Sequence, residues 1–331
     1  MTLDPSAVPA SGPITAENAR RRSSIGVCVL TYRRNRQLAA TLAGLARLDR
    51  PDAGVRIVVV DNNPDASARP VVDEFRDSLG REDGTWSVEY VTEPERGIAR
   101  ARNRAVDACG DADFVAFVDD DELPEPDWLV SLCAVQAASR ADVVVGRVEP
   151  RFDAPPPEWV LAGHYFERPR HATGQRMDWG ITGNVLLSRA VLDRYSPPFD
   201  ERFNLSGGED THFFMRARDD GALIVSADDA VVFERIPPER TRWHWIMRRE
   251  YRRGNTLSLC MRDLHPGLDR RVRRVGQGVL RISQGLLLLG RAPFRRRFDL
   301  APGVHRVCFG LGLLTGLLGY RYEQYVHERY T

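Results

Sequence analysis

Residues 114–122 read Phe-Val-Ala-Phe-Val-Asp-Asp-Asp-Glu, an apolar run that ends in four consecutive acidic residues. A short continuous apolar run is typical of a strand covered on both faces, as in a parallel sheet with helices on each side. In such sheets, ligands bind beyond the carboxyl ends of the strands. We therefore expect Asp119, Asp120 and Asp121 to lie at the edge of the sheet where a ligand binds.

The sequence on either side continues the alternation of strand and helix. Further apolar runs occupy residues 25–30, 55–60, 88–91 and 143–148, and segments with helical spacing separate them. This pattern predicts an α/β fold with a doubly wound, mostly parallel sheet. Because the first two runs end in Thr31-Tyr32 and Asp61-Asn62, we expect three polar strand ends to meet at one rim.

The regular pattern is interrupted after residue 148. Residues 150–180 contain three consecutive prolines and lack clear periodicity, which predicts a long loop over the rim. Residues 222–226 and 230–233 are predicted as two further strands. From residue 237 onward the chain is rich in arginine and has helical spacing.

Composition supports three regions in this chain of 331 residues. All 47 basic residues are arginine, which excludes a lysine nucleophile, Schiff-base chemistry and a P-loop lysine. Residues 1–22 read as a disordered lead-in and residues 23–236 as an α/β domain. Residues 1–237 carry 28 arginines against 39 acids, whereas residues 238–331 carry 19 against 7. The acidic front and the basic rear predict different tasks.

The basic rear, residues 237–331, combines arginine clusters with short apolar stretches such as Leu286–Leu289. These stretches are shorter than the roughly 20 residues that span a bilayer. They suit helices that lie on an anionic membrane surface, and the alternative is a helical appendage packed on the domain at residues 23–236. No nucleic-acid-binding module is recognisable, so we do not expect a nucleic-acid partner.

Two acidic motifs could carry chemistry. Packed carboxylates such as Asp119-Asp120-Asp121 become favourable when a hard cation, Mg²⁺ or Mn²⁺, neutralises them, and the alternative is a solvated turn. In Gly207-Gly208-Glu209-Asp210, one carboxylate could act as a general base, or the pair could only cap a helix.

Two further polar motifs could hold a nucleotide. Asp61 could accept a hydrogen bond from a nucleobase N–H, or it could belong to an Asx turn. The helix that begins after Gly97 could bind an anion, with arginine matching phosphate, or it could be a solvated helix. Arg102 points away from the face shared by Arg100 and Arg104, so the three cannot serve one ligand.

The order of these motifs resembles family 2 glycosyltransferases over about residues 24–235. The resemblance rests on five segments: 29–34, 58–62, Gly97 with Ala101-Arg102-Asn103, 117–121 and 208–210. It implies the GT-A fold and an inverting enzyme that moves a sugar from a nucleotide-diphosphate sugar to an acceptor hydroxyl. The variant Asp-Asp-Asp-Glu-Leu-Pro-Glu-Pro at 119–126 is most similar to the bacterial polysaccharide-assembly branch.

The resemblance also assigns roles position by position. Asp210 falls on the general base, with Glu209 beside it. Asp121 and Asp119 fall on the metal-binding D-x-D motif, for Mn²⁺ or Mg²⁺. Many relatives have a histidine ligand where this chain has Glu234. The donor-binding positions are implied to be Thr31, Tyr32, Arg34, Asp61, Asn62, Gly97, Arg102, Asp119, Asp120, Gly183 and Asn184.

The expected partners are a nucleotide-sugar donor, a glycan or lipid-linked acceptor, and an anionic membrane surface. The expected location is cytoplasmic, peripheral on the inner face of the plasma membrane. Two alternatives remain at this point. One is a metal-dependent nucleotidyltransferase, which would release pyrophosphate. The other is a membrane-associated scaffold without activity.

Overall fold

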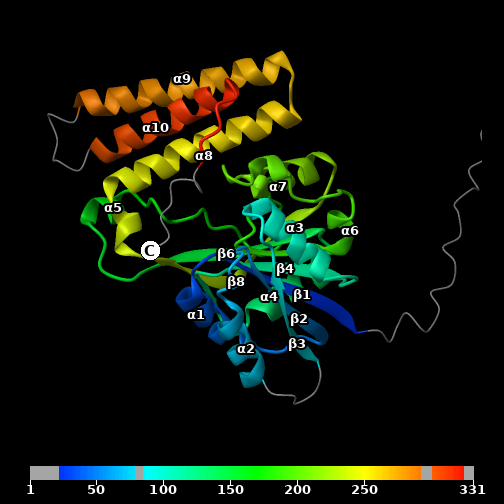
Figure 1. Cartoon of the computed structure of the whole chain (residues 1–331). Helices are drawn as coiled ribbons and strands as arrows, with labels where there is room; N and C mark the ends of the chain where they lie inside the picture. The colour runs from blue at the N-terminus through cyan, green and yellow to red at the C-terminus, as the bar shows by residue number, and fades with distance from the viewer. Residues whose placement is uncertain (1–21, 80–84, 292–299, 324–331) are drawn as a thin grey trace, which may run out of the picture.

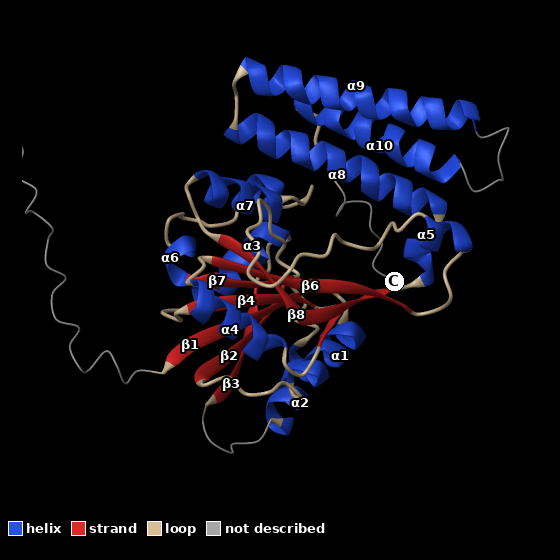
Figure 2. Ribbon diagram, turned by 180° about the vertical axis from the view of Figure 1, so that it is seen from behind, coloured by secondary structure: helices blue, strands red, loops and turns tan. Residues whose placement is uncertain are grey.

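The computed structural model describes residues 22–79, 85–291 and 300–323, and it has a single eight-stranded sheet in the order β3-β2-β1-β4-β7-β6-β8-β5 (Figures 1 and 2). The predicted lead-in lies almost wholly outside the described residues, as do Arg295–Arg297. The strands are β1 (Ser23–Thr31), β2 (Ala53–Asp61), β3 (Trp86–Thr92), β4 (Phe114–Asp119), β5 (Glu122–Pro124), β6 (Val143–Phe152), β7 (Asn184–Ser188) and β8 (Ile224–Ile236).

Helices cover both faces of this sheet, as the continuous apolar strands predict. One face packs against α1 (Asn35–Leu45), α2 (Arg69–Ser78) and α4 (Trp128–Ser139). The other face packs against α3 (Ile98–Ala108), α6 (Arg189–Leu192) and α7 (Glu209–Asp219). In β1, Val27 and Val29 belong to the first core, and Cys28 and Leu30 to the second. Both faces are therefore apolar, and the polar side chains are left to the strand ends.

The parallel half of the sheet confirms the predicted rim. β1 pairs in parallel with β2 and β4, and the register places Thr31 opposite Asp61 and Leu30 opposite Asp119. The carboxyl ends of the three strands therefore lie side by side.

The other half of the sheet departs from a uniformly parallel arrangement. β7 runs antiparallel to β4 and β6, and β5 runs antiparallel to β8. The short β5 pairs Glu122 with Glu234 and brings a second pair of acids to the rim.

The two strands predicted at 222–226 and 230–233 form one long strand, β8. The pairing of β6 with β8 shifts between Gly146 and Arg147, where the partner moves from Ala227 to Val231. The polar residues between these partners form a β-bulge, which interrupts the apolar pattern without ending the strand.

The loop expected over residues 150–180 is shorter, because β6 continues to Phe152. The short helix α5 (Glu158–Ala162) follows, and the short 3₁₀ helix η1 (Glu201–Phe203) precedes α7.

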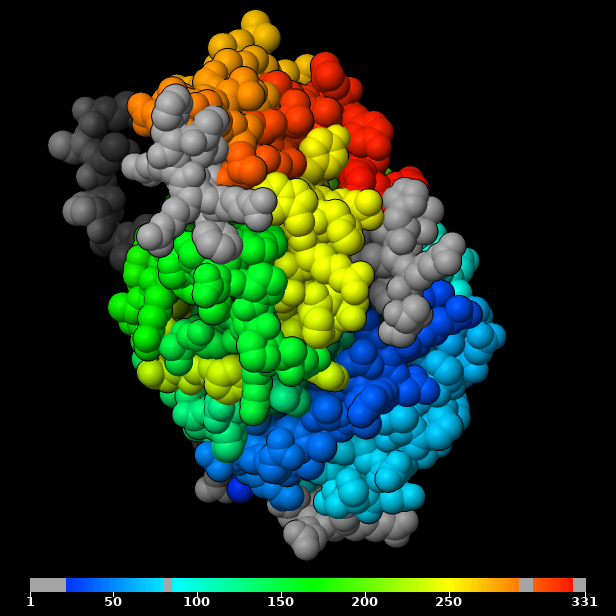
Figure 3. All heavy atoms as spheres, turned by 90° about the vertical axis from the view of Figure 1, so that its left-hand side faces the viewer, coloured from blue at the N-terminus to red at the C-terminus, as the bar shows by residue number. Residues whose placement is uncertain are grey.

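The basic rear is helical, as predicted. It begins with the 3₁₀ helix η2 (Pro238–Thr241) and continues as α8 (Trp243–Leu264), α9 (Leu268–Arg291) and α10 (Leu300–Leu317). These three helices form a layer of their own, with α8 nearest the sheet domain (Figures 1 and 3). Glycines allow close packing in this layer: a Cβ at Gly312 would collide with the backbone of Tyr251, and one at Gly310 with that of Gly278.

Candidate active site

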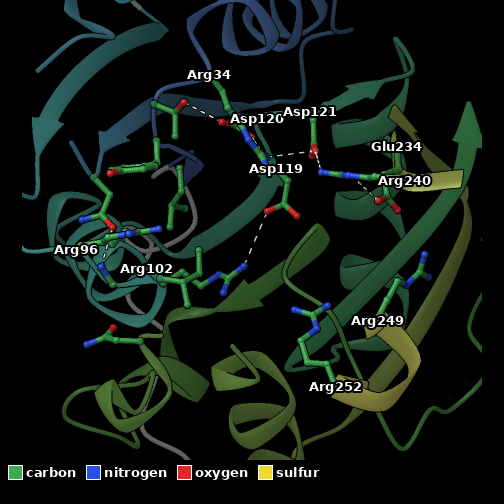
Figure 4. A pocket seen from close by; sticks show the side chains of 18 of the residues that line it. Arg34, Arg96, Arg102, Asp119, Asp120, Asp121, Glu234, Arg240, Arg249 and Arg252 are labelled. Carbon is green, nitrogen blue, oxygen red and sulfur yellow. Dashed lines mark hydrogen bonds and ion pairs between the residues drawn. The ribbon is translucent and has the colours of Figure 1, made fainter. Parts of the chain in front are cut away.

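A cavity of about 300 Å³ opens at the predicted rim (Figure 4). Its walls come from the ends of β1 and β4, the start of α3, and the basic rear of the chain. The walls contain most of the predicted donor-binding positions: Thr31, Tyr32, Arg34, Asn62, Gly97, Arg102, Asp119 and Asp120, together with the predicted metal ligands Asp121 and Glu234.

The four consecutive acids at residues 119–122 have different environments. Asp120 is buried; Thr31 Oγ1 donates to it at 2.8 Å and Arg34 at 3.1 Å. Burial raises the pKa of Asp120 to about 7, although Arg34 opposes the shift. Glu122 is also buried and accepts the Asp119 N–H at 3.0 Å. Burial and the neighbouring Asp119 raise the pKa of Glu122 well above its usual range. Asp120 and Glu122 are therefore buried residues whose hydrogen bonds hold Thr31, Arg34 and Asp119 in position at the rim.

Asp119 offers its carboxylate to the cavity. Its side chain is 45% exposed, and Arg102 lies 3.9 Å from it. Partial shielding from water raises the pKa of Asp119, and the nearby carboxylates of Asp121, Glu234 and Asp210 raise it further. Asp119 therefore lies in a cluster whose negative charge is only partly neutralised, an environment that favours a bound cation.

Arginines occupy the space between the other two predicted metal ligands. Arg240 donates to Asp121 at 2.8 Å and to Glu234 at 3.2 Å, and Arg34 also reaches Asp121 at 3.3 Å. Figure 4 shows Arg240 between the two acids. The predicted ligands Asp119, Asp121 and Glu234 thus share one rim, with an arginine bridging two of them.

One other group in the described part of the chain has the ligand types and spacing of a metal site, Asp200 with His212 and Asp263. Arg202 donates to both of these aspartates, at 2.5–2.8 Å. The group is therefore an ion-pair network with its own cation, and it joins α7 to the end of α8.

The second acidic motif begins α7. Gly207 and Gly208 have φ values of 71° and 99°, a region in which residues with a Cβ are strained. Glu209 is buried and forms an ion pair with Arg102 of α3. Arg102 also faces Asp119, so it connects the start of α7 with the acidic rim. Glu209, predicted as a catalytic residue beside Asp210, is therefore paired with Arg102 inside the protein, and a catalytic role for it stays a prediction.

Asp210 follows Glu209 and is half-buried; its carboxylate accepts the Thr211 N–H at 2.6 Å. It lies near enough to Asp119 to affect the pKa of that residue. The structure thus brings the predicted base close to the predicted metal site, although Asp210 does not itself line the 300 Å³ cavity.

The nucleotide side of the cavity is formed by β1, β2 and α3. The Tyr32 ring lies 5.0 Å from the guanidinium of Arg96. Asn62 accepts the Gly97 N–H at 2.8 Å and donates to the carbonyls of Glu93 and Glu95, so it shapes the loop before α3. Of the arginines near the start of α3, Arg96 and Arg102 line the cavity, and Arg100 and Arg104 do not.

Three predicted donor-binding positions do not line the cavity: Asp61, Gly183 and Asn184. Asp61 has no exposed surface, and its carboxylate accepts from Asn63 N, Ala68 N and Tyr90 Oη, so the Asx-turn interpretation fits this structure. Direct contact of Asp61 with a nucleobase remains a prediction that this conformation does not support.

Asn184 lies in a similar environment, and its contact with the donor likewise stays a prediction. It has no exposed surface; it accepts from Trp128 Nε1 at 2.7 Å and donates to the carbonyls of Arg147 and Ala230. Its role is to join strands inside the sheet. At Gly183, a Cβ would lie 2.7 Å from Glu122 Oε1, so the glycine makes room for the buried acid.

The basic rear contributes residues that sequence reasoning missed. Arg240, Trp245, Arg249 and Arg252 all line the cavity. The expected boundary at residue 236 therefore separates segments that share one site. The arginine pairs were visible in the sequence, but no motif placed them at the rim.

Comparison with known families decides the class of protein. The family model described as "Glycosyl transferase family 2" matches residues 26–196. The chain belongs to glycosyl transferase family 2. Membership favours a glycosyltransferase over the nucleotidyltransferase and scaffold alternatives, and it confirms the resemblance seen in the motifs.

Relatives in family 2 extend the match beyond that segment. The succinoglycan biosynthesis protein ExoM of Rhizobium meliloti (strain 1021) is 33% identical over 307 residues, covering 91% of this chain and 94% of ExoM. The pre-mycofactocin glycosyltransferase of Mycobacterium tuberculosis (strain H37Rv) is 31% identical over 235 residues, covering 68% of this chain and 46% of that protein.

Solved structures confirm the GT-A fold expected of this family. The mannosyltransferase PcManGT from Pyrobaculum calidifontis, in complex with GDP-Man and Mn²⁺, has a TM-score of 0.61 at 17% identity, covering 89% of this chain and 88% of that one. TarS 1-349 of S. aureus, in complex with UDP-GlcNAc, has a TM-score of 0.51 at 17% identity, covering 91% and 93%.

Proposed function

We propose that this glycosyltransferase transfers a sugar, with inversion, from a nucleotide-diphosphate sugar to a hydroxyl of a growing polysaccharide or lipid-linked glycan. The observation that carries the proposal is the buried Arg102, which pairs with Glu209 at the start of α7 and faces Asp119 at the rim. It holds the candidate base next to the acidic residues where a donor diphosphate would lie. The match to ExoM over nearly its whole length supports polysaccharide assembly.

The donor nucleotide would lie along β1 and the start of α3. Tyr32 presents a ring for a base, and Thr31 and Arg34 hold Asp120 in place at the strand end. The N–H groups of Gly97 and Arg100 already donate to Asn62 and Asn204, so at this end of the cavity the guanidinium of Arg96, which lines the wall just before α3, is a group that suits phosphate oxygens.

Asp119 and Asp121 would hold a divalent cation, with Glu234 as a further oxygen ligand. Oxygen ligands suit Mn²⁺ and Mg²⁺. Burial raises the pKa of Asp119, and the nearby carboxylates of Asp121, Glu234 and Asp210 raise it further, so a cation would offset negative charge here. When bound, the cation would neutralise charge that develops on the departing nucleoside diphosphate. Arg240 would have to leave Asp121, or share it, for the ion to bind.

Asp210 would remove the proton of the acceptor hydroxyl as its oxygen attacks the anomeric carbon. The bond from that carbon to the diphosphate oxygen breaks in the same displacement, so the configuration inverts. Arg102 and Glu209 keep the start of α7 in place during this step.

Two substitutions separate the proposed roles. Asp210→Asn should abolish transfer from a donor sugar in a screen with Mn²⁺, while the affinity for UDP or GDP stays within about twofold. Asp119→Asn should weaken Mn²⁺-dependent binding of that nucleotide by about tenfold or more, the loss of roughly one charged interaction. Equal losses of nucleotide affinity in both variants would contradict the assignment.

We also propose that α9 lies on the cytoplasmic face of the plasma membrane. Its exposed stripe consists of Leu268, Val272, Val275, Val279 and Leu286, which are 45–76% exposed. Exposed arginines at 270, 271, 273 and 281 accompany the stripe, a composition that suits an anionic leaflet.

A different helix has the length and composition to cross a membrane. Among the described residues α10 alone meets that test, and about a third of it is buried. It packs between α8 and α9, which favours a surface-bound layer over a spanning helix (Figure 1).

Flotation with vesicles that contain phosphatidylglycerol tests this orientation. The double variant Val275→Glu/Val279→Glu should lose most vesicle binding. The matched substitution Leu161→Glu, at a residue that is 49% exposed in the catalytic domain, should not. Equal flotation of the double variant and the wild type would refute the role of α9.

A further inference from the structure

Arg249 and Arg252 are two cations of the cavity wall that the proposed donor site does not use. They come from neighbouring turns of α8 and line the cavity (Figure 4). Neither forms a hydrogen bond or an ion pair with any described residue. By contrast, Arg34 and Arg240, on the side of the acidic rim, are engaged with carboxylates.

Arg249 is held by aromatic rings. Its guanidinium lies 4.9 Å from the ring of Phe166 and 5.6 Å from that of Trp245. Rings stacked on a guanidinium leave the N–H groups in its plane free to donate. Burial lowers the pKa of Arg249 to about 10, and the carboxylates of Glu234 and Glu250, which form no hydrogen bond or ion pair with it, only partly oppose the shift. A bound anion would supply a direct partner.

The position of the pair along α8 points to the acceptor side. Arg249, Arg252 and Thr256 follow one another at the i, i+3, i+7 spacing of a single helix face. A Cβ at Gly208, two residues before the proposed base Asp210, would collide with the methyl group of Thr256, so this face of α8 lies close to the start of α7. With a rise of about 1.5 Å per residue, Arg252 lies roughly 6 Å along the helix from Thr256. A group bound there would lie near the hydroxyl that Asp210 activates.

We propose that Arg249 and Arg252 form a subsite for a phosphate or diphosphate group carried by the acceptor. The inference rests on the proposed function, because it takes Asp210 as the mark of the acceptor side. One guanidinium is enough to bind both oxygens of a carboxylate. A phosphate or diphosphate has more oxygens and more negative charge, so a pair of arginines suits it better than it suits a carboxylate.

Isothermal titration of the full-length protein with inorganic pyrophosphate, in EDTA, tests the subsite. Arg249→Gln and Arg252→Gln should each weaken pyrophosphate binding by about tenfold or more, since a hydrogen bond to a charged group contributes about 1.5–3 kcal/mol. The control is Arg248→Gln, which removes the same charge from an exposed position of α8 outside the cavity wall and should retain wild-type affinity.

A second titration, with UDP and GDP in Mn²⁺, separates the two possible sources of phosphate. If the subsite serves the acceptor, both variants bind the nucleotide as the wild type does, which also shows that they fold. If nucleotide affinity falls in parallel with pyrophosphate affinity, the arginines hold the donor and the inference is wrong.

Three other results would also overturn it: no pyrophosphate binding by the wild type, an equal loss in Arg248→Gln, or glucuronate binding as tightly as pyrophosphate. A wild type that binds pyrophosphate but neither nucleotide would instead contradict the proposed function.

Discussion

The ion pair between Arg102 and Glu209 should be a main determinant of stability and of the position of α7. Both side chains are buried, with relative exposures of 6% and 3%. Among the described residues, Arg102 Nε and Glu209 Oε2 have no hydrogen-bond partner, so Glu209 depends on Arg102 to offset its charge, whereas Arg102 also lies 3.9 Å from Asp119. Removing one member of such a pair leaves an uncompensated buried charge, which typically costs about 3–5 kcal/mol.

We therefore expect Arg102→Met and Glu209→Leu each to lower the free energy of unfolding by about 3–5 kcal/mol. The double variant should recover most of this loss, because neutral side chains of similar volume leave no buried charge. With a urea m-value of about 3 kcal/mol/M, each single variant should shift the unfolding midpoint down by roughly 1 M or more. Arg104→Met, which removes an exposed arginine of the same helix, is the matched control and should leave the midpoint almost unchanged.

Fluorescence-monitored urea unfolding can follow these shifts, because the fully buried Trp128 packs against the sheet. The reasoning would be refuted if Arg102→Met behaved like Arg104→Met. It would be refuted equally if the double variant lost as much stability as the two single variants added together.

Three further outcomes follow from the geometry. Burial lowers the pKa of His212, so the neutral side chain stabilises the fold above its unfolded pKa of about 6.5, and this effect is lost as pH falls below that value. His212→Gln should therefore flatten the pH dependence of thermal unfolding on the acidic side, and an unchanged slope would count against this. Gly208→Ala should cost about 2 kcal/mol or more because φ is 99°, whereas Gly290→Ala, where nothing lies within 4 Å, should be neutral in the same melt. Arg240→Ala should release Asp121 and raise the affinity for Mn²⁺ in the absence of nucleotide by about tenfold. Electron paramagnetic resonance of the free Mn²⁺ measures this affinity, and weaker binding would mean that Arg240 supports the ion.

The periodicity of the sequence was sufficient to predict the parallel half of the sheet. Runs such as Val55–Val60 are apolar at every position, which requires cover on both faces, and the polar residues after them must then meet at one rim. The antiparallel strands were harder to predict because β5 has only three residues and its pairing with β8 is a tertiary contact. The bulge in β8 was hidden because Asp228-Asp229 has the composition of a turn.

The candidate site was predictable where its chemistry lies in short motifs, as in Asp119–Asp121 and Glu209-Asp210. Burial within a motif could not be read from the sequence: Asp120 and Glu122 are buried, whereas the side chain of Asp119 is 45% exposed. The cavity residues of α8 could not be predicted either. Arg249 and Arg252 reach the rim because a helix distant in sequence packs there, and local spacing does not show this packing.

The identity of the released product tests the central claim most directly. The full-length protein would be incubated with Mn²⁺, membranes as the source of acceptor, and a panel of UDP- and GDP-sugars, and the products followed by ³¹P nuclear magnetic resonance. We predict that one donor yields a nucleoside diphosphate with the wild type and none with Asp210→Asn. Release of a sugar 1-phosphate, the product of nucleotidyl transfer from the same donors, would contradict sugar transfer by this site, as would equal release of nucleoside diphosphate by the Asp210→Asn variant.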